Sequence, residues 1–190
     1  MPVIINGNGT VDTGTVLVGN SDITGLAAGS LPANVIGTGA VLQVVQGTPK
    51  SDTFSTTSTT LVDITGLSAT ITPTSASNKI LVFVDLHIGY SIYAGIVHLL
   101  RGSTKIYAGD GGLARCGLYS NVYGNSGNAL IPVTAVCLDS PATTSATTYK
   151  LQTATYGAGT QYVNRTGDNN NDPTRDGLTV STITLMEIAA

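Results

Sequence analysis

The stretch Asn78–Tyr90, NKILVFVDLHIGY, decides the fold. Every second residue of it is apolar, which gives one continuous face made of Ile80, Val82, Val84, Leu86, Ile88 and Tyr90. An alternation with period two predicts a β-strand with one face in a hydrophobic core. The opposite face is mixed, because Leu81 and Phe83 lie among polar residues. We therefore expect another sheet or another subunit to cover this second face, and Leu81, Phe83 and His87 are our candidate interface residues.

Further short strands are expected on both sides of this stretch. The expected strands share β-branched or alternating apolar residues and are bounded by Gly, Pro, Asn or Asp: Val41–Gln46, Leu61–Ile64, Ala69–Thr72, Gly95–Arg101, Thr104–Ala108, Ala129–Leu138, Thr147–Thr155 and Leu178–Ile188. Ser51–Thr60 reads as a Ser/Thr-rich edge or hairpin. Two long polar loops follow, at about Gly109–Asn128 and Gly157–Gly177. No window has sustained helical periodicity, so the sequence predicts an all-β fold, an antiparallel β-sandwich or jelly-roll-like domain.

The first 40 residues differ from the rest in composition. They are rich in Gly, and their apolar runs, such as Val3–Ile5 and Val16–Val18, are too short to form a core. A pure linker is more polar than this. We therefore expect an extended N-terminal arm over residues 1–40 that attaches to a partner, and a β-sandwich domain over residues 41–190.

The composition excludes several classes of protein. Only 10% of the residues are charged and the net charge is −3, which argues against a nucleic-acid partner. No apolar run is long enough to cross a bilayer, and the N-terminus lacks the features of a signal peptide. We expect no membrane insertion and no cofactor.

The residues that commonly carry catalysis are sparse. The two histidines, His87 and His98, both lie in apolar strands, so buried or interface roles are expected. The alternative is a ring of one histidine from each of three subunits around a three-fold axis, holding an ion or water. Cys116 and Cys137 have no histidine near them in the sequence, and we expect free thiols that are not nucleophiles. We expect no enzymatic activity.

The segment Asp168–Asp172, DNNND, resembles the opening of a calcium-binding EF-hand loop. The match then fails, because Pro173 replaces the glycine of that loop and Thr179 replaces its bidentate glutamate. Asp and Asn also form turns by bonding to nearby backbone groups. We expect a turn-rich loop here and predict no metal site, with calcium as the alternative.

Several tyrosines lie in or beside the two polar loops, in the company of asparagines. Such side chains combine a flat apolar surface with hydrogen-bonding groups, which suits adaptable polar recognition, sugars included. Loop tyrosines also commonly anchor their own loops. The candidate receptor-binding residues share this chemistry: Tyr119, Asn121, Tyr123, Asn125, Tyr162, Asn169 and Asn170.

Three stretches resemble phrases found in tail-fibre and other receptor-binding virion proteins of tailed phages: Ile71–Val82, Leu138–Lys150 and Ser181–Ile188. The opening Val3–Gly7 also resembles fibre N-termini. The resemblance implies a homotrimeric, β-structured virion component, assembled in the host cytoplasm. It supplies no set of functional residues.

We therefore expect a short trimeric fibre. Its arm would attach to other virion proteins, and its β domain would contact the host surface, where glycan is the expected receptor. The alternative is a capsid decoration (cement) or head-fibre protein, because this chain is much shorter than a typical tail fibre. A depolymerising tailspike is disfavoured, since that enzyme needs a pair of acids in a groove and this chain has one glutamate, Glu187.

Overall fold

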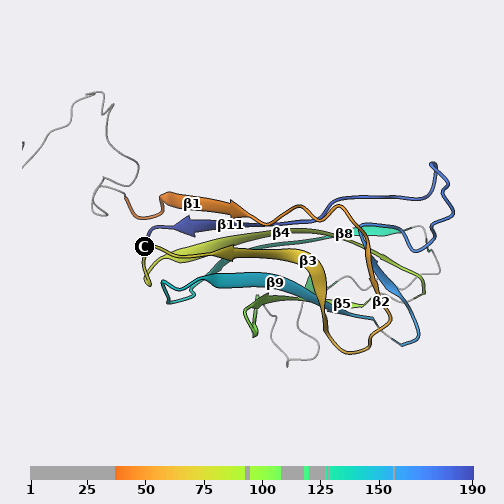
Figure 1. The fold of residues 1–190 in the computed structure, drawn as a ribbon, viewed down its shortest axis with the longest axis horizontal. Helices are drawn as coiled ribbons and strands as arrows, with labels where there is room; N and C mark the ends of the chain where they lie inside the picture. Colours follow the sequence, from red (N-terminus) through yellow and green to blue (C-terminus); the bar gives the residue numbers. More distant parts are fainter. Residues whose placement is uncertain (1–36, 93–94, 108–117, 120–126, 128, 156) are drawn as a thin grey trace, which may run out of the picture. The chain divides into compact units, whose positions relative to one another are not determined.

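Two antiparallel β-sheets lie one over the other in the computed structural model (Figure 1). The structure describes residues 37–92, 95–107, 118–119, 127, 129–155 and 157–190, and no helix occurs among them. Sheet one contains β1 (Val41–Gln46), β2 (Phe54–Thr56), β4 (Lys79–Tyr90), β8 (Leu130–Asp139), β10 (Gln161–Val163) and β11 (Thr182–Ile188). Sheet two contains β3 (Val62–Ile71), β5 (Ile96–Arg101), β6 (Thr104–Ile106), β7 (Leu118–Tyr119) and β9 (Thr147–Ala154). The antiparallel β-sandwich predicted from the sequence is confirmed.

The strand β4 organises sheet one. Along one edge it pairs with β8 over ten residues, and along its other edge it pairs first with β11 and then with β10. The strand β1 extends the sheet beyond β11, and β2 extends it beyond β10. In sheet two, β9 lies between β3 and β5.

The hydrophobic core lies between the sheets, and β4 contributes the alternating face expected from the sequence. Ile80, Val82, Leu86 and Ile88 are completely buried. Sheet two meets them with buried side chains from β3, β5 and β9, among them Leu67, Ile71, Val97, Leu99, Tyr149 and Leu151. Burying a side chain of this size contributes roughly 1.5–3 kcal/mol, so this periodic face is a main source of stability.

The mixed face of β4 points away from sheet two. Leu81 is half-buried there and Phe83 is exposed. No described strand of this chain covers them. A cover from another sheet or another subunit, as expected from the sequence, stays a prediction.

Several strand boundaries differ from the sequence-based expectation. Leu61–Ile64 and Ala69–Thr72 are expected as separate strands, but Val62–Ile71 forms one strand, β3, because Gly66 adopts a positive φ of 81° that allows a bulge. The strand β10 lies inside the expected loop Gly157–Gly177, and β7 lies inside the expected loop Gly109–Asn128. At the C-terminus, β11 begins at Thr182 rather than at Leu178, because the residues before it close a loop.

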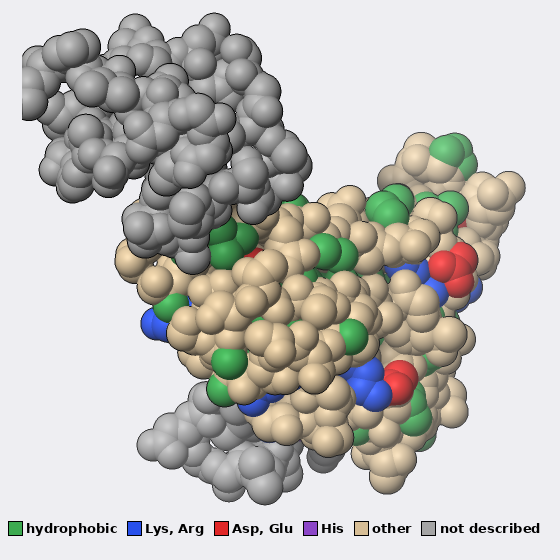
Figure 2. Space-filling model, turned by 60° about the vertical axis from the view of Figure 1, so that its left-hand side comes forward, with side chains coloured by type: hydrophobic (Ala, Val, Ile, Leu, Met, Phe, Trp, Pro, Cys, Tyr) green, Lys and Arg blue, Asp and Glu red, His purple; other side chains and the backbone are tan. Residues whose placement is uncertain are grey.

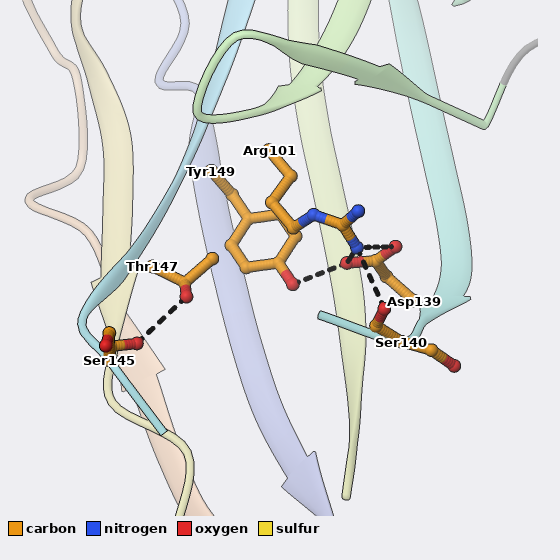
Figure 3. Close-up of polar contacts among 6 residues, drawn as sticks. All are labelled: Arg101, Asp139, Ser140, Ser145, Thr147 and Tyr149. Atoms are coloured by element: carbon orange, nitrogen blue, oxygen red, sulfur yellow. Dashed lines mark hydrogen bonds and ion pairs between the residues drawn. The ribbon is translucent and has the colours of Figure 1, made fainter. Parts of the chain in front are cut away.

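A polar cluster joins the two sheets at the end of β8 (Figure 3). Arg101 of β5 donates from Nη1 to both carboxylate oxygens of Asp139, each at 2.8 Å. The Tyr149 hydroxyl of β9 donates to Asp139 Oδ2 at 2.7 Å. Burial, and then the hydrogen bond to Asp139, raise the pKa of Tyr149 well above its usual value. The phenol therefore stays protonated and keeps this donor across the physiological pH range.

Residues 37–190 form one compact unit. Residues 1–36 lie outside the described residues. The expected arm over residues 1–40 and the boundary at residue 41 therefore stay predictions.

Candidate functional site

One end of the domain collects parts of both long polar loops. The backbone N–H of Asp168 donates to the carbonyl of Gly127 at 2.7 Å, so Asp168 of the second expected loop lies directly against Gly127 of the first. A Cβ added at Gly127 would overlap the Asp168 carboxylate, and one added at Gly167 would overlap the Tyr90 carbonyl. Gly127 of the first expected loop therefore meets Gly167 and Asp168 of the second at the end of β4 that carries Tyr90.

The loop between β10 and β11 is closed at its base by a buried hydrogen-bond network. Asn164, with a positive φ of 64°, donates from Nδ2 to the carbonyls of Lys50 at 2.7 Å and Asp52 at 3.1 Å. Its Oδ1 accepts from the hydroxyl of Ser181, and its backbone carbonyl accepts from Thr179 N–H. Asn164 and Ser181 are fully buried. This network fixes where the loop leaves and rejoins the sheet.

The tip of the same loop is ordered by its own acidic residues. Asp172 Oδ1 accepts from the N–H and the hydroxyl of Thr174, at 2.9 and 2.6 Å. Asp172 also pairs with Arg175 at 3.3 Å, and its N–H donates to Asp176 at 2.9 Å. Asp172 therefore makes the turn contacts expected of such residues. Within the described ranges, no group of three or more His, Cys, Asp or Glu side chains could hold a metal ion.

Tyr162 lies on β10, opposite Gly89 of β4, and not in a loop as the sequence suggested. The guanidinium of Arg165 stacks over its ring, 4.1 Å from the centroid. Arg165 also donates to the carbonyls of Thr166 and Gly167, at 3.1 and 3.0 Å. Sequence reasoning missed Arg165, because a single arginine in a polar loop follows no period. The pair Tyr162–Arg165 offers an aromatic ring beside a cation, next to the loop that carries Asn169 and Asn170.

The other candidate receptor-binding residues are only partly placed. Asn169 and Asn170 are exposed in the loop after β10. The backbone of Tyr119 pairs with Ile96 of β5. Asn121, Tyr123 and Asn125 lie outside the described residues, as does Cys116. The structure therefore groups Tyr162, Asn169 and Asn170 on one segment, and Gly127 lies against Asp168 of the same segment.

The two histidines are not brought together. His87 lies on the outer face of sheet one, with Nδ1 3.9 Å from Asp85 Oδ1. His98 lies on β5, where its neighbours Val97 and Leu99 face the core, so it points to the other side of sheet two. Burial, and the charge of nearby Lys105, lower the pKa of His98. The histidine ring around a three-fold axis stays a hypothesis that one chain does not test.

Cys137 is a free thiol on β8, half-buried against the core. Burial, and the nearby carboxylate of Asp139, raise its pKa. A thiol with a raised pKa is a poor nucleophile.

The opposite end of the domain carries both the C-terminus and the start of the described chain. Gly39 N–H donates to the Ala189 carbonyl at 2.8 Å, and Ala189 N–H donates to the Ala40 carbonyl at 2.9 Å. Figure 1 shows the C-terminus at one end of the strands and the loop between β10 and β11 at the other. Residues 39–40 and the C-terminus therefore lie at one end of the sandwich, and the loop between β10 and β11 lies at the other.

The buried carboxylate of Glu187 anchors this terminal end. It accepts from Gln43 Nε2 at 2.6 Å, Asn78 Nδ2 at 2.6 Å, Thr74 N at 2.7 Å and Thr74 Oγ1 at 2.8 Å. Burial by itself raises the pKa of Glu187, but these hydrogen bonds together hold it below its usual value. The chain's one glutamate is therefore a structural anion, held by neutral donors.

The surface carries little charge. Figure 2 shows a face on which uncharged polar side chains and backbone predominate, with isolated hydrophobic side chains and few charged ones. No helix in the described part of the chain is long and apolar enough to cross a membrane. Contacts with such a surface depend on hydrogen bonds and apolar area more than on ion pairs.

No family model matches the chain, and no curated protein matches its sequence. Among solved structures, it is similar to that of infectious bursal disease virus Gt strain, with a TM-score of 0.38 and 16% identity over 78% of this chain. The Gx strain structure gives a TM-score of 0.36 and 15% identity over 78% of this chain. The structure of T=1 particles derived from infectious bursal virus gives 0.37 and 15% over 76% of this chain. The chain spans only 37–39% of the length of these solved chains. TM-scores below 0.5 decide neither the fold nor the function of this chain.

Proposed function

We propose that this chain is a structural protein of a virus particle, a short trimeric fibre of a tailed phage. Its N-terminal segment attaches to other proteins of the particle, and the loop end of its β-sandwich contacts the host surface. The likeness of Ile71–Val82, Leu138–Lys150 and Ser181–Ile188 to phrases of phage receptor-binding proteins supports this proposal.

The observation that carries the proposal is that the domain has two different ends, one beside the C-terminus and one at the loop after β10. The described chain starts at Gly37, and two residues later Gly39 bonds to Ala189 near the C-terminus, while Gly127 meets Asp168 at the other end. The twelve residues of β4 separate these ends by roughly 40 Å, at about 3.3 Å per residue. A protein anchored through residues 1–36 at one end presents its loops at the other, as a fibre requires.

The loop end has the chemistry of weak polar recognition. Tyr162 offers an aromatic ring, Asn169 and Asn170 offer amide groups, and Arg165 adds a cation. Aromatic rings and amides are the groups that contact sugars and other polar surfaces. Single contacts of this kind are weak, but three copies on one axis raise the apparent affinity through effective concentration. We assign a host-surface glycan as the receptor class and assign no catalytic activity to the domain.

The experiment compares phage particles that carry variant forms of the protein. In one, Asn169 and Asn170 become alanine. In the matched control, Thr143 and Thr144, which lie between β8 and β9 at the terminal end of the sandwich, become alanine. We expect adsorption to host cells to fall at least tenfold for the first variant and to stay unchanged for the second. Equal adsorption by both variants would contradict host contact through this loop.

Locating the protein on the particle tests the structural role separately. Antibody labelling of intact particles, viewed by electron microscopy, is expected to mark the tail. Labelling spread over the capsid would instead support the alternative, a decoration or head-fibre protein that stabilises the capsid. Purified particles that carry no label and contain no copy of the chain would overturn the virion assignment altogether.

A further inference from the structure

The outer face of sheet one carries an apolar surface that the strand register assembles from four strands. Leu81 of β4 lies between Met186 of β11 and Leu138 of β8. Val44 of β1 lies beside Met186 and extends this row of paired residues. One row further along, Phe83 lies beside Val136. We call this set the apolar face: Val44, Leu81, Phe83, Val136, Leu138 and Met186. The exposed fractions of Val44, Val136 and Leu138 are 56%, 54% and 52%, and that of Phe83 is 37%.

The charged residues of β4 lie at the two margins of the apolar face. Lys79 is at the terminal end, and Asp85, followed by His87, is toward the loop end. Lys79 and Asp85 are separated by about 20 Å along the strand, at about 3.3 Å per residue. The six members of the apolar face, between these margins, are all uncharged. An apolar centre with charge at its rim is the anatomy of a protein–protein interface.

The dimensions of the apolar face suit such an interface. Four strands spaced by about 4.8 Å span roughly 19 Å, and the seven residues Lys79–Asp85 of β4, with both charged margins included, span roughly 23 Å. The projected area is therefore on the order of 450 Å², and the relief of the side chains increases the accessible area beyond this. A standard interface uses about 800 Å² on each partner. The apolar face and its margins therefore supply about half of such an interface on each copy, and a second copy of this chain offers the same flat, uncharged centre.

We propose that the copies of the trimer pack their apolar faces around a rotational symmetry axis parallel to β4. Each row of paired residues in one copy then meets the same row of its neighbours. The proposal rests on the proposed function and names its assembly surface. A cyclic arrangement places residue Gly37 of every copy at one end and every recognition loop at the other. It buries Leu81 and Phe83, the two residues that made the outer face of β4 unusual in the sequence, and adds four residues that the sequence did not indicate.

An antiparallel two-fold pair is the competing arrangement. It would place Lys79 of one copy opposite Asp85 of the other, which is favourable for their charges, but it would point the recognition loops in opposite directions. In the cyclic arrangement, like charges approach each other only at the margins, where water and salt screen them. His87 Nδ1, 3.9 Å from Asp85 Oδ1, also lies beside the acidic margin.

Cross-linking distinguishes these arrangements. The variants Lys79→Cys and Asp85→Cys are made separately in the full chain, in a background in which Cys116→Ser and Cys137→Ala remove the natural thiols. Each is treated with a bismaleimide shorter than the 20 Å or so that separates the two positions. We expect each variant alone to form a cross-linked two-chain species. Cross-links that form only when the two variants are mixed would overturn the cyclic arrangement.

Mass in solution separates the failure of this proposal from that of the proposed function. Light scattering of the untreated background protein is expected to give three times 19.3 kDa. A trimer without cross-links in either variant or their mixture would overturn the apolar face as the interface and leave the trimer standing. A stable monomer would overturn both.

A surface variant gives an independent check. Val136→Glu places a charge within the apolar face, whereas Leu61→Glu places one at an exposed apolar position before β3. We expect the first to lose the trimer at concentrations where the second keeps it, with circular dichroism of both unchanged. A folded Val136→Glu variant that is still trimeric would contradict the proposal.

Discussion

Replacement of Glu187 is expected to destabilise the terminal end of the domain. The carboxylate is completely buried and accepts four hydrogen bonds, all from neutral donors of Gln43, Thr74 and Asn78. Glu187→Gln keeps the size and one oxygen but presents an NH₂ group where a second oxygen accepted. Glu187→Ala removes every acceptor and leaves buried donors without partners.

The contacts set the expected magnitudes. A hydrogen bond to a charged group contributes about 1.5–3 kcal/mol, and the contributions are not additive. In Glu187→Gln the retained oxygen can serve Thr74 and Asn78, so essentially the bond from Gln43 is lost, and we expect a loss of about 2 kcal/mol. In Glu187→Ala we expect about 4 kcal/mol, because each unsatisfied buried donor adds its desolvation penalty of about 1–3 kcal/mol. Either value is a large share of a typical total of roughly 5–15 kcal/mol.

The effect must also depend on pH. The hydrogen bonds hold the folded-state pKa of Glu187 below its usual value, so the carboxylate stabilises the fold fully above the unfolded pKa of about 4.3. That stabilisation is lost as the pH falls through the lower, folded-state pKa. The difference in unfolding free energy between wild type and Glu187→Gln is therefore expected to be full at neutral pH and to shrink in acid below about pH 4.

Urea unfolding of the full chain, at one protein concentration and a series of pH values, measures this difference. The matched control is Asp168→Asn, which makes the same chemical change on an exposed carboxylate; we expect it to stay within about 0.5 kcal/mol of wild type. A Glu187→Gln variant as stable as wild type at neutral pH, or one whose deficit is the same in acid, would refute the reasoning.

Two further predictions concern the links between elements. Asp139→Ala is expected to destabilise the domain by about 3 kcal/mol, because it leaves the guanidinium of Arg101 without its carboxylate. Tyr149→Phe removes one hydrogen bond to the same carboxylate and is expected to lose about 1–1.5 kcal/mol. Urea unfolding that ranks the two variants in the opposite order would contradict the cluster's role. A Cβ at Gly89 would overlap the carbonyl of Arg165, so Gly89→Ala is expected to lose about 1–3 kcal/mol and to increase hydrogen exchange in the loop after β10. Gly37→Ala, where a Cβ meets nothing within 4 Å, is its control, and equal exchange in both would refute this packing.

The sequence predicts the core strands because residues that face the core alternate with residues that face away from it. In Asn78–Tyr90 this alternation covers thirteen residues, and the observed β4 differs from the predicted strand by one residue at its start. Short strands are too short to show such an alternation. The three residues of β10 carry too few alternations to stand out in a polar segment, and they form a strand only because β4 and β2 supply partners on both sides.

The candidate sites were predictable to different degrees. Leu81 and Phe83 stood out because apolar residues on an otherwise polar face are visible in one strand. Their neighbours Val136 and Leu138 could not be assigned to the same surface, since that depends on the pairing register of β4 with β8. The same holds for Arg165, whose stacking on Tyr162 depends on how the chain turns after β10. Composition identifies the kind of residue that recognises a ligand, but the pairing of strands decides which of them meet.

The polar anchors of the domain suggest why recognition and assembly can vary independently. The loop between β10 and β11 is closed by Asn164 and Ser181, which bond to each other and to the backbone around Lys50. Substitutions at its exposed positions, such as Asn169, leave that buried network intact. The terminal end has its own anchor in Glu187, which pairs with Ile80, whereas Asn164 and Ser181 bond to the backbone of His87. The two anchors are therefore about 23 Å apart along β4, at roughly 3.3 Å per residue. The apolar face lies between them and depends on neither anchor for its side chains. Because loops held by a rigid scaffold tolerate change, a protein built this way can alter what its loop end binds while the surface that we propose for assembly stays the same.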